Sequence, residues 1–296
     1  MAKGRELKGR IRSVENTRKI TRTMEMVATS KMKRAQDRVV AARPYAAALG
    51  EVMSRLYSPE LAERFPLLRQ PARVRRAAVL LLTGNRGLAG AFNTNLIREA
   101  RTRIAELEGK GAEVELHVAG RKGIGYFRYV GRAMAQQRTD LGDRPSAADA
   151  ASLVDELMDR FRSGALDAVY VIYAKFNSAL STPPTTLQVL PVEPPAAEAG
   201  TARQRDYILA PSPEAILTEL LPSYVRNSVY RALAETTAAF YGAQRTAMKS
   251  ATDNAGEMLN GLKRTYNRAR QAQITQEIAE IVGRSEERFS RNAETA

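Results

Sequence analysis

Two glycine-bearing segments are the places where the chain could contact phosphate. Gly84-Asn-Arg-Gly87-Leu-Ala-Gly90 follows an apolar run and precedes a helix-like stretch, where phosphate-binding loops usually lie. Its spacing matches neither G-x-x-x-x-G-K-[ST] nor G-x-G-x-x-G, and Gly120-Arg-Lys-Gly123-Ile-Gly125 also matches neither. We therefore interpret the first segment as a tight turn into a helix and the second as a basic surface loop.

Residues for other kinds of catalysis are scarce. The chain has no cysteine, which excludes a disulfide framework, a thiolate nucleophile and a zinc-thiolate site. Its one histidine, His117, lies between Leu116 and Val118 in a strand-like run and is interpreted as a hydrogen-bonded sheet residue. No H-E-x-x-H, G-x-S-x-G or paired acidic motif is present. We expect no catalytic residue, no metal site and no cofactor.

The net charge of +14 predicts attraction to acidic surfaces, which include nucleic acid, anionic lipid and acidic protein faces. A basic coiled-coil protein that binds nucleic acid is the alternative to a protein partner. The basic N-terminal segment has Tyr45 as its nearest aromatic residue, which argues against base stacking. The longest apolar run, residues 77–82, is far shorter than the roughly 20 residues that span a bilayer. We expect a cytoplasmic protein with no transmembrane segment of its own.

The first element that must position any site is a very long helix over residues 3–57, which are rich in strong helix formers. Alternate steps of four and three residues from Leu7 to Leu56 fall mostly on apolar residues, as in a coiled coil. The repeat fails at three consecutive positions, Arg18, Thr21 and Glu25. Across the same turns, apolar residues lie on a different face, at Ile20, Met24 and Val27. That face predicts either a contact with another protein or a local stutter of the coil.

Residues 72–210 predict a small Rossmann-like α/β domain. Strands are expected at residues 78–82, 113–119, 168–174 and 186–192, and helices near 91–108 and 147–162. Alternating strands and helices indicate a largely parallel sheet.

A second long helix is expected from Pro213 to about Val282. Because a compact domain returns the chain close to where it left, the two long helices should form an antiparallel coiled coil. At 1.5 Å per residue, the second should extend about 25 Å beyond the first. That end carries an apolar stripe of Ile274, Ile278, Ile281 and Val282, which is typical of a surface buried by another protein. The expected domains are therefore 1–60, 72–210 and 211–283, followed by a polar tail, 284–296, without regular structure.

Several strings resemble one family closely. VENTRKITRTMEMVATSKM at 14–32 and ARPY at 42–45 are similar to the N-terminal helix of the F-type ATP synthase gamma subunit of bacteria. AMKSATDNA at 247–255 and YNRARQAQITQEI at 266–278 resemble its C-terminal helix. Residues 83–90 resemble a turn of its central domain. The resemblance covers residues 2–283 in the family's order.

The resemblance implies a role and partners. In that family the coiled coil is the rotor shaft inside a hexamer of three alpha and three beta subunits, and the α/β domain stands with the epsilon subunit on the membrane c-ring. Ion flow, here expected to be of protons, turns the shaft, which drives the beta subunits through states of different nucleotide affinity. Nucleotide and magnesium are bound by alpha and beta. The chain would thus be a non-catalytic, peripheral subunit on the cytoplasmic face of the bacterial membrane.

The resemblance also implies site residues. A rotor–stator contact with an acidic beta-subunit loop is implied at Met24, Lys31, Lys33 and Arg245. Tip contacts with beta are implied at Arg270, Gln271, Thr275 and Glu277. The stripe of Ile274, Ile278, Ile281 and Val282 would be the apolar bearing, and Tyr207 a residue of the foot on the membrane ring. One departure is Gln244-Arg-Thr-Ala-Met-Lys249 in place of the family's Arg-Met-Val-Ala-Met-Lys, so that Arg245 would supply the cation.

Overall fold

The protein is described here by a computed structural model that covers residues 2–56, 64–193 and 212–294. Two long helices begin and end the chain, α1 (Ala2–Leu56) and α6 (Pro213–Glu294), as the sequence predicts. The expected end of the second helix near Val282 is wrong, because α6 continues to Glu294. After Gly283 no glycine or proline interrupts the segment, so nothing in its backbone chemistry ends the helix.

The described chain divides into two compact units whose boundaries lie inside the long helices. One unit contains residues 1–26 and 248–296, and the other contains residues 27–247. The second unit includes the inner parts of α1 and α6 because their apolar faces pack against the α/β domain. The expected boundaries near 60, 72 and 210 therefore separate segments of the sequence. The compact units divide instead between residues 26 and 27 and between residues 247 and 248.

The second unit contains one five-stranded sheet in the order β3-β2-β1-β4-β5. The strands are β1 (Arg76–Leu82), β2 (Glu113–Ala119), β3 (Gln136–Arg138), β4 (Ala168–Ala174) and β5 (Pro184–Leu190). The first four are parallel and β5 is antiparallel to β4, which confirms a largely parallel sheet. β5 ends two residues before the expected position because Pro191 has no N–H group to continue the ladder.

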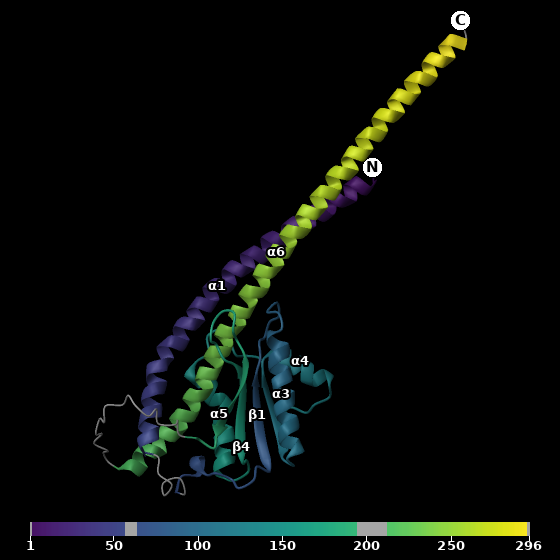
Figure 1. The fold of residues 1–296 in the computed structure, drawn as a ribbon. Coiled ribbons are helices and arrows are strands. Elements are labelled where there is room, and N and C mark those ends of the chain that lie inside the picture. Colours follow the sequence, from purple (N-terminus) through teal and green to yellow (C-terminus); the bar gives the residue numbers. More distant parts are fainter. Residues whose placement is uncertain (1, 57–63, 194–211, 295–296) are drawn as a thin grey trace. The chain divides into compact units, whose positions relative to one another are not determined.

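Helices cover both faces of this sheet, as Figure 1 shows. They are α3 (Phe92–Gly109), α4 (Arg121–Tyr129) and α5 (Ala147–Arg162), and a short 3-10 helix spans Pro66–Leu68. α3 and α5 lie where the sequence predicts helices. The prediction of a basic loop at 120–125 is wrong, because these residues lead into α4; its two glycines hide the helical pattern.

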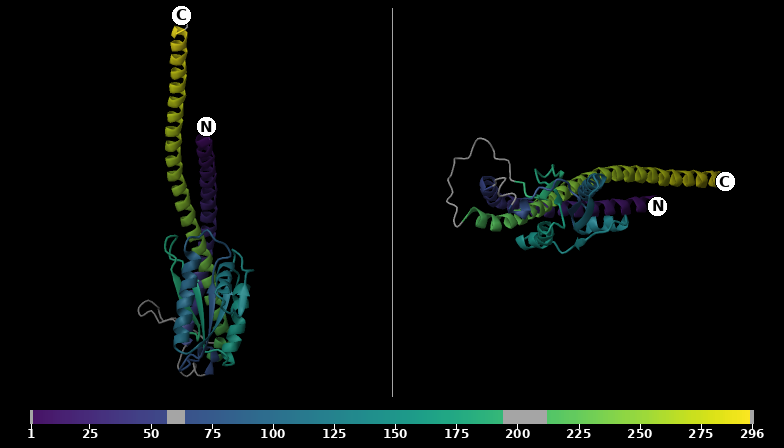
Figure 2. Two further views of the ribbon diagram at one scale, coloured as in Figure 1. Left: turned by 90° about the vertical axis from the view of Figure 1, so that its right-hand side faces the viewer. Right: turned by 90° about the horizontal axis from the view of Figure 1, so that it is seen from below.

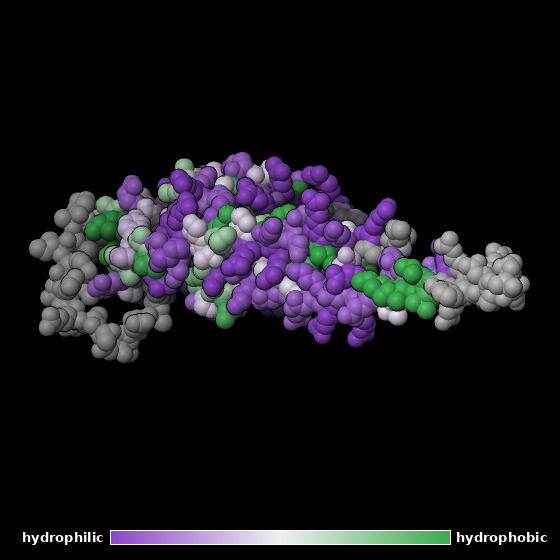
Figure 3. Space-filling model, turned by 90° about the horizontal axis from the view of Figure 1, so that it is seen from above, coloured by the Kyte–Doolittle hydropathy of each residue, from purple (hydrophilic) through white to green (hydrophobic). Residues whose placement is uncertain are grey.

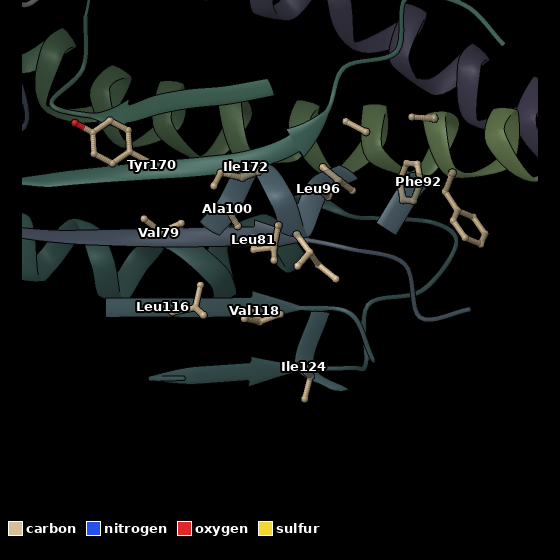
Figure 4. Close-up of a cluster of buried hydrophobic side chains, with 14 of the residues drawn as sticks. Val79, Leu81, Phe92, Leu96, Ala100, Leu116, Val118, Ile124, Tyr170 and Ile172 are labelled. Carbon is tan, nitrogen blue, oxygen red and sulfur yellow. The ribbon is translucent and has the colours of Figure 1, made fainter. Parts of the chain in front are cut away.

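Each face of the sheet has its own apolar core. Val79 and Leu81 point to the face covered by α3, where they meet Leu96 and Ala100 (Figure 4). The alternate residues of β1, including Leu80, point to the face covered by α5. Successive side chains of a strand point to opposite faces, so a strand buried on both sides is continuously apolar, as β1 and β4 are.

Parts of the two long helices complete these cores. Within the second unit, Met32, Ala35 and Val39 of α1 belong to the core on the α3 face. The early part of α6, which includes Leu217 and Val225, belongs to the core on the α5 face. Figure 2 shows this green part of α6 alongside the sheet. The helices are therefore anchored to the α/β domain by apolar burial.

The turn after β1 is linked by hydrogen bonds to the beginnings of α3 and α4. Three backbone N–H groups that could otherwise contact a phosphate donate instead to nearby side chains: those of Gly84, Arg121 and Gly123 donate to Asn93 Oδ1, Asn85 Oδ1 and Thr83 Oγ1, at 2.9, 3.0 and 3.1 Å. The turn therefore joins the beginnings of α3 and α4 to the sheet. Residues 84–90 thus form a turn that leads from β1 into α3, as the sequence predicts.

His117 is buried on β2, with 4% of its surface exposed. The expectation that it is hydrogen-bonded is wrong, since neither ring nitrogen has a hydrogen-bond partner in the described part of the chain. The nearest carboxylate oxygen, Glu115 Oε2, lies 3.8 Å away and is engaged by Arg160. Burial lowers the pKa of His117 from its usual 6.5, and the charge of Glu115 only partly opposes this.

Within the described residues, none of the helices has the length and apolar character needed to cross a lipid bilayer. In the same residues, no group of three or more His, Asp or Glu side chains is placed to hold a metal ion.

The buried histidine predicts a pH-dependent stability. The folded chain binds a proton at His117 less readily than the unfolded chain does. Neutral His117 therefore makes its full contribution to the free energy of unfolding above about pH 6.5, and this contribution is lost as pH falls below that value. We expect the free energy of unfolding to fall between about pH 7.5 and about pH 5.5, and His117→Leu to flatten that dependence. Urea unfolding of the full chain across this range measures it. An unchanged slope in the variant would contradict the assignment.

The turn predicts a strict requirement for glycine at position 120. Gly120 has a φ of +109°, and a Cβ atom there would lie 2.2 Å from the Thr83 carbonyl oxygen. We expect Gly120→Ala to lower the free energy of unfolding by about 3 kcal/mol or more. The control is Gly125→Ala in α4, where a Cβ atom meets nothing within 4 Å. That variant should raise the free energy of unfolding by no more than about 1 kcal/mol.

Candidate functional site

The first unit is an antiparallel pair of helical segments from α1 and α6. Thr252 Oγ1 donates to Thr21 Oγ1 at 2.8 Å, and Lys263 Nζ lies 3.3 Å from Glu15 Oε1. Residue numbers rise along one segment as they fall along the other, so the segments run in opposite directions. Half-buried apolar residues line the seam between them, including Leu7, Ile11, Leu262 and Tyr266.

One polar position of the coil repeat, Thr21, lies inside this seam. Thr21 is only 9% exposed, and its hydroxyl is paired with Thr252. The two helical segments therefore still face each other at this polar position. The contact and the stutter both stay predictions for the neighbouring apolar face.

That neighbouring face is exposed on α1. In the first unit, Ile20 is 60% exposed and Met24 is half-buried. Isolated apolar residues are normal on a surface, but these two are spaced one helical turn apart on one face. The use of this face as a contact stays a prediction.

A basic hollow of about 380 Å³ lies on the other side of the seam. It is lined by four cations, one acid and one leucine: Arg18, Lys19, Arg22, Lys263, Glu15 and Leu259. At 3.6 residues per turn, Arg22 and Met24 lie about 160° apart around α1, so the hollow and the apolar face are separate surfaces. Sequence analysis missed Arg18 and Lys263 as members of this site. The charged residue at position 18 of the coil repeat is the sequence signal that could have indicated this site.

Two of the predicted stator contacts have partners within their own chain. Lys31 Nζ lies 2.7 Å from Asp143 Oδ2 and 3.2 Å from the Tyr241 hydroxyl. Lys33 forms an ion pair with Asp37 of the same helix at 2.9 Å. Arg245 of α6 is half-buried in the second unit. The role of Met24 and of these three cations as a contact stays a prediction.

The pKa of Asp143, the partner of Lys31, is shifted by its surroundings. Burial by itself would raise the pKa of Asp143, but hydrogen bonds from Lys31 and Tyr241 hold it below its usual value. The pKa of Tyr241 is raised, first by burial and then by its contact with Asp143. Asp143 is therefore ionised and Tyr241 protonated at neutral pH.

The predicted tip residues lie on the described surface of α6. All four are exposed, namely Arg270, Gln271, Thr275 and Glu277. Two of them make contacts within the helix, since Thr275 Oγ1 donates to the Gln271 carbonyl at 3.0 Å and Gln273 Nε2 donates to Glu277 Oε1 at 2.9 Å. Tyr207, the predicted foot residue, lies outside the described residues.

The predicted bearing is an apolar stripe that no described residue of the chain covers. Every residue from position 274 to 282 is exposed, whereas Ala269 and Gln273 are still half-buried. The stripe is 46–67% exposed at its four members, Ile274, Ile278, Ile281 and Val282. Figure 3 shows apolar patches of this kind on a largely hydrophilic surface. The seam with α1 therefore ends near residue 273, and beyond it the apolar face of α6 has no partner among the residues that the structure describes.

Known proteins share this sequence over nearly its whole length. A family model described as ATP synthase matches residues 3–286. The ATP synthase gamma chain of Gemmatimonas aurantiaca is 74% identical over 283 residues, which cover 96% of this chain and 98% of that one. The ATP synthase gamma chain of Leptospira biflexa serovar Patoc is 43% identical over 286 residues, which cover 97% and 99%.

Solved structures share the fold. A chain in the rotor of the Euglena gracilis mitochondrial ATP synthase superposes with a TM-score of 0.65 at 18% identity, covering 92% of this chain and 99% of that one. A chain in a second Euglena structure, of OSCP, F1 and the c-ring, gives a TM-score of 0.66 at 19% identity, with 95% and 93% covered. The matched family model and the bacterial relatives leave one assignment: the chain belongs to the ATP synthase gamma chain family.

Proposed function

We propose that the helical surfaces described above are the means by which this gamma chain, a non-catalytic subunit and the central shaft of an ATP synthase, couples ion flow to ATP synthesis. The shaft turns inside the hexamer of alpha and beta subunits and pushes each beta subunit through its conformations. The uncovered apolar stripe at Ile274–Val282 is the observation that carries the proposal. A plain scaffold in which α1 covered all of α6 would not present it.

The stripe is suited to a bearing. Aliphatic side chains make no directional bonds, so a ring of apolar residues from the hexamer could enclose them in any rotational position at similar free energy. The exposed polar residues Arg270, Gln271, Thr275 and Glu277 begin just below and alternate with the stripe. They would supply the orientation-dependent contacts with the beta subunits.

The middle of the shaft is suited to contact with acidic loops. The hollow formed by Arg18, Lys19, Arg22 and Lys263 carries a net positive charge, because Glu15 is its single acid. Across the seam, the apolar face at Ile20 and Met24 offers a surface of a different kind. A shaft whose sides differ in this way binds the conformations of the beta subunits unequally as it turns, which is the requirement for driving them.

The remaining assignments follow from the family. The partners are the alpha, beta and epsilon subunits and the membrane c-ring, with Tyr207 in the foot on that ring. The chain is peripheral to the membrane on its cytoplasmic face, protons are the coupling ion, and no nucleic acid is bound. Nucleotide and magnesium are held by alpha and beta, so the chain needs no cofactor.

The bearing predicts that a charge on the stripe weakens assembly without unfolding the chain. Ile278 is 56% exposed, so Ile278→Asp should change the free energy of unfolding of the chain by no more than about 0.5 kcal/mol. In the assembled complex the carboxylate would be buried without a partner, and recovery of the chain with alpha and beta should fall at least about tenfold. Purification of reconstituted complexes measures this. Gln276→Asp, on the opposite side of α6, is the control, and equal losses would refute the bearing.

The apolar face predicts a separate effect on coupling. We expect Met24→Lys to reduce the number of ions pumped per ATP hydrolysed while the complex still assembles, because the new charge alters one face of the shaft and leaves the seam intact. Ion pumping and ATP hydrolysis by the complex in lipid vesicles measure the ratio. Asn16→Lys introduces the same charge at an exposed polar position of α1 and should leave the ratio unchanged. If Met24→Lys couples normally, this face is not a working contact.

A further inference from the structure

We propose that residues 139–145, named here the strap, clamp the α/β domain to α1 and α6, and that Lys31 is a positioning residue of this clamp. In this assignment Lys31 transfers torque within its own chain and does not contact a beta subunit. The proposal rests on the shaft function above. All of its residues lie in the second unit, between Val27 and Ala247.

The strap is held by both long helices at one residue. Lys31 Nζ of α1 contacts Asp143 Oδ2 at 2.7 Å, and Arg38 Nη1 of the same helix donates to the Asp143 carbonyl at 3.0 Å. Tyr241 of α6 lies under the same ammonium group, which is 3.2 Å from its hydroxyl and 5.2 Å from its ring centre. Asp143 thus joins the strap to α1, and Lys31 joins α1 to α6.

The other end of the strap is held by the sheet. Asn85, in the turn after β1, donates from Nδ2 to the carbonyl oxygens of Thr139 and Leu141, at 3.2 and 2.9 Å. The same turn touches α6, because a Cβ atom added to Gly84 would lie 3.0 Å from the Phe240 ring. The strap therefore connects the central strand of the α/β domain to both helices.

The clamp adds directional contacts to the apolar cores. Hydrophobic burial by itself gives no preferred direction against a displacement of a helix on the sheet. Other polar contacts also hold α6 to the α/β domain, such as the ion pair of Arg226 with Asp155 at 2.8 Å, whereas the clamp engages α1 as well. Charge-assisted hydrogen bonds have preferred distances and angles, so they resist such a displacement. If the α/β domain is turned by the membrane ring, the torque must enter α1 and α6 inside the second unit, where the clamp lies.

The geometry of Lys31 is also unlike that of an outward contact. The side chains of Lys31 and Asp143 are 32% and 44% exposed, so the pair is partly withdrawn from water. To reach an acidic loop of another subunit, Lys31 would have to abandon Asp143 and Tyr241 together. This would leave the ionised Asp143 without its nearest cation.

A double-mutant cycle in the assembled ATP synthase tests the clamp. Lys31→Met and Asp143→Asn each remove the same ion pair, so each should lower the number of ions pumped per ATP hydrolysed at least about twofold, and the double variant should be no worse than either single one. Lys31→Arg keeps the charge and should restore most of the ratio. Hydrogen exchange over residues 139–145, measured on the full chain, should accelerate about tenfold in both single variants.

The matched control is the ion pair of Arg132 and Glu108, which joins two parts of the α/β domain at 2.6 Å. Its side chains are 33% and 42% exposed, close to the values for Lys31 and Asp143. Glu108→Gln removes the same kind of interaction outside the clamp. It should leave both the coupling ratio and the exchange of residues 139–145 unchanged.

Two outcomes overturn the proposal. If Lys31→Met uncouples the complex while Asp143→Asn does not, Lys31 acts on another subunit. If exchange over the strap accelerates and coupling is unchanged in both variants, the strap is structural only. Failure of the proposed function itself looks different, because complexes with the unaltered chain would then show no coupled ion pumping.

Discussion

The burial of the apolar stripes of α1 and α6 is the constraint on which the rest of the structure depends. Neither helix can remove its stripe from water alone, since most of the stability of a long helix comes from packing of its apolar face. In the second unit the stripes are buried on the α/β domain, which supplies a core on each face of its sheet. In the first unit they are buried on each other. Two sets of partners along one pair of helices explain why the compact units divide inside α1 and α6.

Function occupies the places where this burial is incomplete. The seam contains the hydrogen-bonded pair of Thr21 and Thr252, where a more stable coil would contain leucine, and α6 carries four exposed aliphatic residues beyond the seam. A structure optimised for stability alone would have neither feature. In the proposed function, the hydrophobic seam holds the two helices together, and the exceptions to it are the contact surfaces.

Regular elements could be predicted from the sequence, whereas contacts between distant residues could not. α5, β2 and β4 have their expected bounds because apolar periodicity is a local signal. β3 and α4 were missed, since a three-residue strand and a helix with two glycines have little local pattern. The partnership of Lys31 with Asp143 joins residues 112 positions apart, and no spacing rule predicts it. For the same reason His117 was expected to be hydrogen-bonded, because a sequence does not show which strand neighbours carry suitable acceptors.

The hydrogen bond between Thr21 and Thr252 has one more consequence. A buried polar pair in a coiled coil specifies alignment at some cost in stability, because any other alignment would leave a hydroxyl group facing aliphatic side chains. Sliding α1 along α6 by one heptad would move it by about 10 Å and change how much of α6 stays uncovered. The threonine pair therefore fixes the register of α1 against α6. It sets how far the shaft reaches, with a precision that the repetitive apolar seam could not provide.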